Sequence, residues 1–378
     1  MIRFLSFLAE ASSLDNKELG HLSHVKNIPH EDPLRAHEAV KLLKDFHQHK
    51  LGMGNEVTGQ NKIDGGASVV VGHDEQGPFV SDKHRIKTGK VARTPEEVDQ
   101  HFGHHPSYAA QLKNVLQHAH KFVSKGRTIQ GDLLFTEHDK DKHSVTPNRI
   151  TYGIKHNAKI GLAAHTEITN GVAHAITPGA IQQHKDVFIP QSEYKPNPST
   201  YAPKDRKAAE THIAAAEKLL RQHTTDHLTP DHVKHFTSYI GQSEQRNSPP
   251  TVEGYKKYLK EKGEKEALKL KTPAGQQKKR DQYNAHIQHV DDNAKHFQRT
   301  INTRHHLEQA TEAMLKDVHH PDMTTKIDGK ASPGEGIVLL KKDSSGVDRP
   351  QAKAVSKVAI EALRNNQARF ATQPKEEG

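Results

Sequence analysis

The sequence has no cysteine and no tryptophan, and aromatic residues make up only 5% of its 378 residues. The lack of cysteine excludes disulfides and thiolate metal sites, and it fits a reducing compartment. Only 33% of the residues are hydrophobic, so we expect thinly packed helices or loops beside a smaller core. No apolar run is long enough to span a bilayer, and we expect no membrane partner.

Basic residues are in excess, since 55 Lys and Arg against 46 Asp and Glu give a net charge of +9. This excess predicts a polyanion partner or a phosphate-bearing ligand, with a generally basic surface as the alternative. Histidine is abundant, at 31 residues, but no HExxH motif occurs among them. Without cysteine they cannot complete a zinc finger either. We interpret them mainly as surface residues that gain charge below roughly pH 6.5.

Apolar periodicity predicts a mixture of helices and strands, followed by a long helical region. Helical structure is expected at 15–50, 94–102, 107–126 and 205–223, and strands at 67–72, 78–82, 128–137, 148–156, 159–168, 185–194 and 334–343. Since a lone strand is not stable by itself, the strand at 334–343 should rejoin the sheet of the first half. The predicted organisation is an N-terminal tail (1–20), the first part of a core (21–200), a basic helical insertion (201–320), the last core strands (321–360) and a C-terminal tail (361–378).

The predicted insertion contains a strongly basic stretch at 259–280, with eight Lys or Arg against three Glu. Such a stretch is either the solvated face of a helix or an electrostatic contact to nucleic-acid phosphates.

The tetrapeptide KIDG occurs twice, at 62–65 and at 326–329. Asp-Gly favours a tight turn, so either copy could be purely structural. The first copy precedes a predicted strand hairpin, whereas the second lies in a loop just before the last strand. We interpret Lys62 as the candidate nucleophile, because further motifs follow it in order, and the copy at Lys326 as a turn.

These further motifs are "SDKHR" (81–85), "GDLLF" (131–135), "EGIV" (335–338) and "AKAVSK" (352–357). The series resembles the covalent nucleotidyltransferase superfamily of ATP-dependent DNA ligases, RNA ligases and mRNA capping enzymes. It is still more similar to an uncharacterised family of tailed-phage proteins with the same ligase-like order. The resemblance covers roughly 20–200 and 334–357, and it implies an α+β fold. That fold would be a mainly antiparallel nucleotidyltransferase (ligase adenylation) core with a helical insertion.

The resemblance also implies a set of site residues, with ATP and Mg²⁺ as cofactors. Lys62 would be the catalytic nucleophile, and Glu335 and Asp132 would hold the metal. The nucleotide-binding residues would be Ile63, Asp64, Gly65, Lys83, Arg85, Asp132 and Lys353. These residue types suit the chemistry, because a lysine amine must be unprotonated and correctly oriented to attack phosphorus. Carboxylate oxygens suit Mg²⁺, and lysine ammonium groups suit phosphate oxygens.

Some positions depart from the family pattern. Asp132 stands where ligases usually have Glu, and Lys83 stands where Arg is usual. In the last motif, Lys357 is the alternative to Lys353 for the family's lysine. Tyr152 is a candidate for stacking on the base. No β-rich stretch typical of the OB-fold domain of DNA ligases follows, so the resemblance favours an RNA-ligase-like enzyme.

We therefore expect an ATP-dependent nucleotidyltransferase that seals nucleic acid through a covalent lysine-AMP intermediate, acting on 5′-phosphorylated strand ends or nicks. The alternative is a non-catalytic phage protein that binds nucleic acid or the virion on the same fold. A third candidate is an adenylyltransferase that modifies a protein. The non-catalytic protein differs from the two enzyme candidates because it needs no reactive lysine.

The N-terminal stretch "FLAE" (7–10) is similar to L-x-E sites cut by head-maturation proteases of large tailed phages. On this interpretation residues 1–10 form a capsid-targeting tag and a phage head protease is a partner; the alternative is a frayed helix. The expected location is the cytoplasm of an infected bacterial host, with packaging in the phage head if the tag is real.

Overall fold

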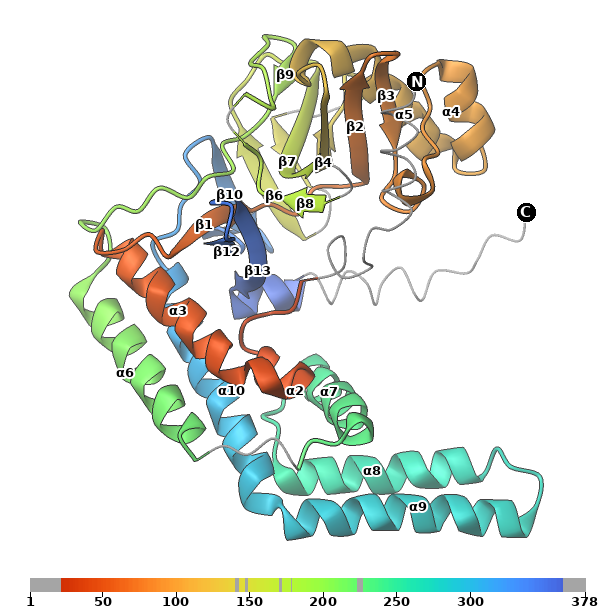
Figure 1. The fold of residues 1–378 in the computed structure, drawn as a ribbon, viewed down its shortest axis with the longest axis vertical. Coiled ribbons are helices and arrows are strands. Elements are labelled where there is room, and N and C mark those ends of the chain that lie inside the picture. Colours follow the sequence, from red (N-terminus) through yellow and green to blue (C-terminus); the bar gives the residue numbers. More distant parts are fainter. Residues whose placement is uncertain are drawn as a thin grey trace. The chain divides into compact units, whose positions relative to one another are not determined.

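The protein has an α+β fold with antiparallel sheets, seen in the computed structural model (Figure 1). The structure describes residues 22–139, 143–146, 149–169, 172–177, 179–222 and 227–362. The tail that contains "FLAE" lies outside these residues, as does most of the C-terminal tail. The described residues divide into two compact units: 54–197 and 315–362 lie in the first, and 23–53 and 198–314 lie in the second. Within the described ranges, no helix is long and apolar enough to cross a membrane.

The first unit contains three sheets, and the smallest of them joins distant parts of the chain. Its strand order is β1-β12-β13, with bounds Val57–Lys62, Gly336–Lys342 and Asp348–Val355. In its register Lys62 pairs with Gly336, which pairs with Val355 on the other side. The predicted strand at 334–343 therefore does rejoin the first half, and β1, which the apolar pattern did not reveal, is its partner.

The largest sheet has the order β3-β2-β4-β7-β8, and β9 is added parallel to β7. Its strands are β2 (Ser68–Asp74), β3 (Gly77–Ser81), β4 (Arg127–Phe135), β7 (Ile160–Thr169), β8 (Val172–His174) and β9 (Val187–Phe188). Alternate residues such as Val69, Val71 and Leu133 pack against α4 (Pro95–Phe102) and α5 (Pro106–Phe122). Because strand side chains alternate between faces, Asp132 lies on the face away from these helices.

The helix cap, the strand hairpin and the helix predicted from short patterns in this part of the sequence are all present, although one helix ends earlier than expected. Thr94 caps α4 by accepting a hydrogen bond from the amide of Glu97, as its capping motif predicts. The hairpin after the first KIDG is β2–β3, and the short 3-10 helix η2 (Ile86–Thr88) follows it. The helix α5 ends at Phe122 rather than near 126, because Val123 is already extended and bridges to Ile181.

The third sheet has the order β11-β10-β6-β5, with β5 (Ser144–Val145), β6 (Ile150–Ile154), β10 (Met323–Ile327) and β11 (Lys330–Ser332). The second KIDG forms the turn between β10 and β11. Asp328 and Gly329 have φ values of 50° and 77°, the left-handed region that a tight turn of this kind requires. Lys326 is exposed on β10 and alternates with the buried Thr325 and Ile327. The interpretation of this copy as a turn is confirmed.

The second unit is helical. Its elements are α2 (Ile28–Glu31), η1 (Pro33–Arg35), α3 (Ala36–Lys50), α6 (Pro203–Leu220), α7 (Pro230–Gln245), α8 (Val252–Ala267), α9 (Pro273–Asp292) and α10 (Ala294–Leu315). The sequence analysis placed α3 in the core of the first half, but the chain contacts group 23–53 with the helical unit. Helical spacing reveals a buried face without identifying its partner, and here that partner is α6.

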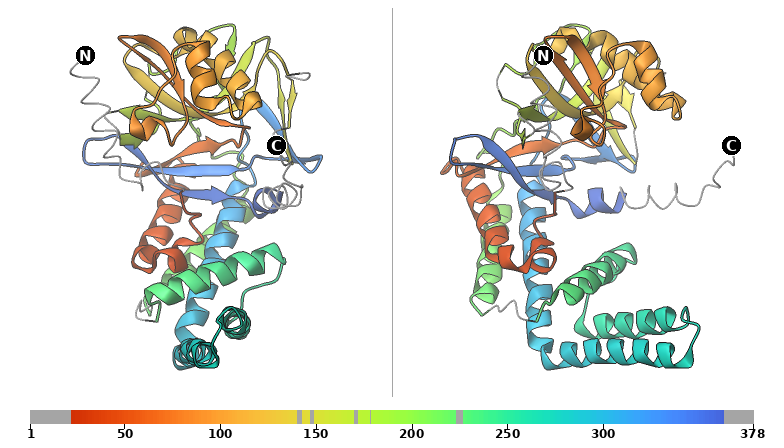
Figure 2. Two further views of the ribbon diagram at one scale, coloured as in Figure 1. Left: turned by 90° about the vertical axis from the view of Figure 1, so that its right-hand side faces the viewer. Right: turned by 45° about the vertical axis from the view of Figure 1, so that its right-hand side comes forward.

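The core of the helical unit is largely aromatic and includes Phe236, Tyr255, Tyr283 and Phe297. A buried ion network lies beside it, in which the Nζ of Lys26 is 2.9 Å from Glu244 Oε1 and 2.5 Å from Glu308 Oε1. The helices α8 and α9 form a long hairpin in this unit (Figure 2).

Candidate functional site

The candidate site surrounds Lys62, the last residue of β1. Lys62 pairs with Gly336, so Glu335, which directly precedes β12, lies next to it. On the other side of β12, Gly336 pairs with Val355, and Lys353 lies two residues earlier on β13. Residues two apart on a strand share a face, so Lys353 and Lys62 lie on the same face of this sheet. Three motifs that are far apart in the sequence thus meet at one place.

Lys62 makes ion pairs with two carboxylates. Its Nζ is 2.8 Å from Glu335 Oε2, and it also contacts the carboxylate of Asp64. The second oxygen of Glu335 accepts a hydrogen bond of 2.8 Å from the amide of Asp64. The side chain of Glu335 is fully buried, and that of Lys62 is only 11% exposed. These contacts fix the lysine, the carboxylate and the KIDG backbone as one group.

Burial and charge act in opposite directions on these groups. Burial alone would lower the pKa of Lys62, but Glu335 and Asp64 outweigh it and raise that pKa above its ordinary value. The amine is therefore an ammonium at neutral pH in this state. Burial raises the pKa of the Glu335 carboxyl to about 8, although Lys62 opposes this shift. Burial also acts to raise the pKa of Asp64, but Lys62 outweighs it and the net shift is downward.

Asp132 faces the KIDG backbone from β4. A Cβ added at Gly65 would lie 2.7 Å from the Cβ of Asp132 and 2.9 Å from the carbonyl oxygen of Leu133. The glycine is thus required by close approach of the two segments. Burial raises the pKa of Asp132, and the backbone of Gly65 opposes the shift by hydrogen bonding to the carboxylate.

His165 is a member of the site that the motifs did not identify. A β-bulge in β7 places it beside Asp132, with 4.0 Å between its Nε2 and Asp132 Oδ1. Burial lowers the pKa of His165, which favours a neutral ring. Bulges often occur next to functional sites, where they redirect a side chain. No periodicity signal in the sequence marks this irregularity.

Of the remaining basic residues, Lys353 and Lys83 affect or lie near the Lys62 site, whereas Arg85 and Lys357 contact other groups. Lys353 is half-buried, and its pKa is lowered by burial first and then by Lys62, with a smaller effect of Lys83. Lys83 itself is exposed in the turn after β3. Arg85 is directed elsewhere, because its guanidinium lies 4.7 Å from the ring centre of Phe102 and near Asp82. Lys357 is exposed and lies 3.8 Å from Glu361.

Tyr152 is only 1% exposed, and its ring belongs to the core of the third sheet. Its hydroxyl accepts a hydrogen bond of 3.0 Å from the amide of Asp64 and donates one of 3.2 Å to the carbonyl of the same residue. The expectation that Tyr152 stacks on a base does not agree with this burial. Its position instead orients the KIDG backbone.

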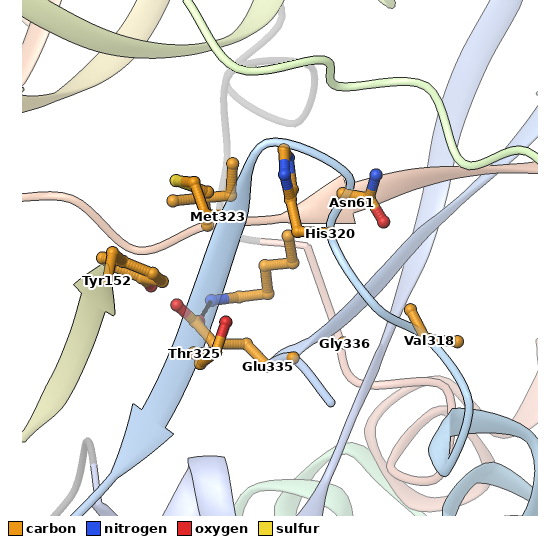
Figure 3. A pocket seen from close by; sticks show the side chains of 11 residues that line it. Asn61, Tyr152, Val318, His320, Met323, Thr325, Glu335 and Gly336 are labelled. Carbon is orange, nitrogen blue, oxygen red and sulfur yellow. Dashed lines mark hydrogen bonds and ion pairs between the residues drawn. The ribbon is translucent and has the colours of Figure 1, made fainter. Parts of the chain in front are cut away.

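A small pocket opens on one side of Lys62 (Figure 3). Its lining residues are Asn61, Lys62, Ile63, Tyr152, Val318, His320, Met323, Thr325, Gly334, Glu335 and Gly336. Thr325 and Met323 come from β10, which the sequence analysis did not assign as a strand. The alternation of apolar and polar residues in "MTTKI" is the signal that could have identified it.

The structure brings together Lys62, Asp64, Gly65, Asp132, Lys353 and Glu335, with Ile63 buried beneath them at 9% exposure. Among the described residues, no group of three or more carboxylates or histidines has the geometry of a ready metal site. Mg²⁺ is commonly bound by one or two carboxylates together with substrate phosphates, so Glu335 and Asp64 fit that role by their chemistry.

Comparison with known proteins gives one family and no named relative. Neither a search of curated proteins nor a search of solved structures found a significant match. A family model matches residues 20–351, which include every residue of the site except Lys353. On this match, the chain belongs to the family described as a family of unknown function (DUF6267).

Proposed function

We propose that the protein is an ATP-dependent nucleotidyltransferase in which Lys62 carries the nucleotide covalently. The observation that supports this most directly is the meeting of Lys62 and Glu335, with 2.8 Å between Nζ and Oε2 in a buried setting. The motifs that suggested the function are 273 residues apart at this contact. The electrostatic effect of Asp132 and Lys62 on Lys353 places these residues near one another, and this proximity also supports the proposal.

In the proposed step the Nζ of Lys62 attacks the α-phosphorus of ATP. A P–N bond forms, the bond from phosphorus to the bridging oxygen breaks, and pyrophosphate leaves with that electron pair. The lysine must lose one proton before attack and a second as the bond forms. Glu335 is placed to accept a proton from Nζ, because its carboxylate contacts that atom and burial raises its pKa to about 8.

The other residues would bind and orient. The ammonium groups of Lys353 and Lys83 would contact phosphate oxygens, and Asp132 would contact the ribose or the metal. Glu335 and Asp64, which now pair with Lys62, would hold Mg²⁺, and the ion would neutralise triphosphate charge. Tyr152 holds the amide and carbonyl of Asp64, which keeps the loop after Lys62 in place.

One observation favours a second candidate, a non-catalytic module that binds nucleic acid or the virion. The two carboxylates raise the pKa of Lys62, and a lysine with a raised pKa is a poor nucleophile. A buried ion pair that only stabilises the sheet would have the same geometry. The two candidates differ in whether nucleotide becomes covalently attached.

The deciding experiment is self-adenylation. The purified protein is treated with pyrophosphate to remove bound nucleotide, incubated with α-labelled ATP and Mg²⁺, and denatured. We expect label on the wild-type chain and on Lys326→Met, but none on Lys62→Met. The Lys326 variant is a matched control, because it alters the lysine of the same tetrapeptide at an exposed position on β10. Circular dichroism should confirm that both variants are folded.

The outcome against the proposal is a folded wild-type protein that takes up no label from ATP or GTP. A label that persists in Lys62→Met would also refute the role of this lysine. Strand sealing is a separate question, since it concerns the acceptor. A duplex with a 5′-phosphorylated nick should be sealed by an adenylated ligase, whereas label transfer to a protein would identify the protein-modifying alternative.

A further inference from the structure

The outer half of the α8–α9 hairpin carries a concentration of lysines without acidic partners. Residues 260–280 contain eight Lys or Arg and three Glu, and 267–280 contain no acidic residue. Arg280 pairs with Glu264 at 3.1 Å, and Lys279 pairs with Glu266 at 3.7 Å. The third acidic residue of this stretch, Glu261, has its Oε1 atom 3.9 Å from the Nζ of Lys257. Each carboxylate is therefore already engaged.

Lys262 donates hydrogen bonds to His235 and Tyr258, and Lys260 lies farther from the end of the hairpin. The four remaining lysines, which we call the tip lysines, are Lys265, Lys269, Lys271 and Lys278. All four are exposed, and among the described residues none has an ion pair or a side-chain hydrogen bond. Like charges so close together repel, so the fold gains no stability from this arrangement. Their placement indicates a site for an external anion with many charges.

The same tip exposes apolar surface. Leu268 and Leu270 alternate with two of the tip lysines in the connecting loop and are 69% and 39% exposed. The aromatic core of the unit ends at Leu259 and Tyr283, so these leucines lie beyond it. No aromatic residue occurs between 259 and 282. Proteins that bind single strands generally stack bases on aromatic rings, and the tip lacks such rings.

We propose that the tip of the α8–α9 hairpin binds the phosphate backbone of duplex DNA without reading its sequence. The tip lysines come from the end of α8, the connecting loop and the first turns of α9. A duplex that lies across the end of the hairpin can therefore contact several of them through its phosphates. This surface adds a partner contact outside the Lys62 site, and binding without nucleotide tests it independently of adenylation.

The experiment measures binding of the whole protein to a fluorescent DNA duplex of about two helical turns over a range of salt concentrations. The tip variant changes the four tip lysines to glutamine. The control variant changes Lys204, Lys207, Lys218 and Lys234, four other exposed lysines on α6 and α7 of the same unit, to glutamine. Both variants lose the same charge, so only the position differs.

Each phosphate contact contributes about 0.9 to the slope of log affinity against log salt, so its loss weakens binding about eightfold at roughly 0.1 M salt. We expect the tip variant to lose a slope of about 2 to 4 and the control to lose less than about 1. An equal loss in both variants would overturn the proposal, because binding would then be due to overall charge.

Two further probes address the kind of partner. A single strand of the same sequence should bind more weakly than the duplex, and tighter binding through the tip lysines would overturn the assignment to duplex. Vesicles with anionic lipids should not compete with the duplex. Vesicle binding that depends on the tip, with no duplex binding, would overturn the proposal in favour of a membrane.

Discussion

The buried pair of Lys62 and Glu335 allows a sharp test by a double-mutant cycle of Lys62→Met, Glu335→Gln and the combined variant. At 2.8 Å and an effective dielectric constant of about 20, the Coulomb attraction is about 6 kcal/mol before desolvation is subtracted. Removal of one partner of a buried pair typically costs about 3–5 kcal/mol, because an uncompensated charge remains. We expect this loss in Lys62→Met, which leaves Glu335 and Asp64 together without a cation.

The other two variants of the cycle should lose less stability than Lys62→Met. Glu335→Gln leaves Asp64 as a partner for Lys62, so we expect a loss of about 1–2 kcal/mol. The double variant removes the charges of Lys62 and Glu335 but leaves Asp64 without its cation. Because the Asp64 side chain is 29% exposed, we expect a loss of only about 1–2 kcal/mol. The coupling energy is then at least about 2 kcal/mol.

The assay is native-state hydrogen exchange on peptides from β1 and β12, because it reports the opening of this sheet separately from the helical unit. Lys326→Met serves as the control. The cost of Lys62→Met should also depend on pH, because a buried Glu335 without its cation can be protonated. The loss should be small near pH 5 and full near pH 9. Additive single effects would refute the pair as a stabilising contact.

Three further predictions concern other parts of the molecule. His30 is buried with neither ring nitrogen bonded within the described ranges, and burial lowers its pKa from 6.5 to about 3. Since the unfolded state binds more protons, stability should fall as the pH drops from about 6.5 towards 3. His30→Leu should remove this loss and add about 1–2 kcal/mol at pH 7, measured by urea unfolding. Gly65→Ala would place a Cβ 2.7 Å from that of Asp132 and should reduce self-adenylation by about a hundredfold. Alanine at the neighbouring Gly66, where the nearest atom lies at 3.3 Å, should be tolerated better. Gly263→Ala would meet the facing tyrosine of α9 at 2.7 Å, so hydrogen exchange should show the hairpin destabilised by about 1–3 kcal/mol.

Much of the local structure could be predicted from the sequence. The capping motif at Thr94 and the Asp-Gly turn at 328–329 act within a few residues, so short patterns are sufficient to identify them. The hairpin β2–β3 and the strands β4, β6 and β7 follow from their alternation and β-branched residues.

What could not be predicted depends on contacts between distant segments. The strand β1 has the polar sequence VTGQNK, and it is a strand because β12 pairs with it. Arg85 was expected at the nucleotide site, but a favourable position over Phe102 directs its guanidinium elsewhere. The position of His165 depends on a bulge, which no periodicity in the chain reveals.

The separation of Lys62 from Glu335 also has a consequence for synthesis on the ribosome. The two residues are 273 positions apart, which corresponds to roughly 15 to 55 s at about 5–20 residues per second. During that time the edge of β1 that pairs with β12 is open, and Lys62 lacks the carboxylate of Glu335. The helical segment of the second unit emerges in this interval. The ion pair between Lys62 and Glu335 therefore forms late in synthesis. A chain released before residue 335 would contain the KIDG motif without this carboxylate.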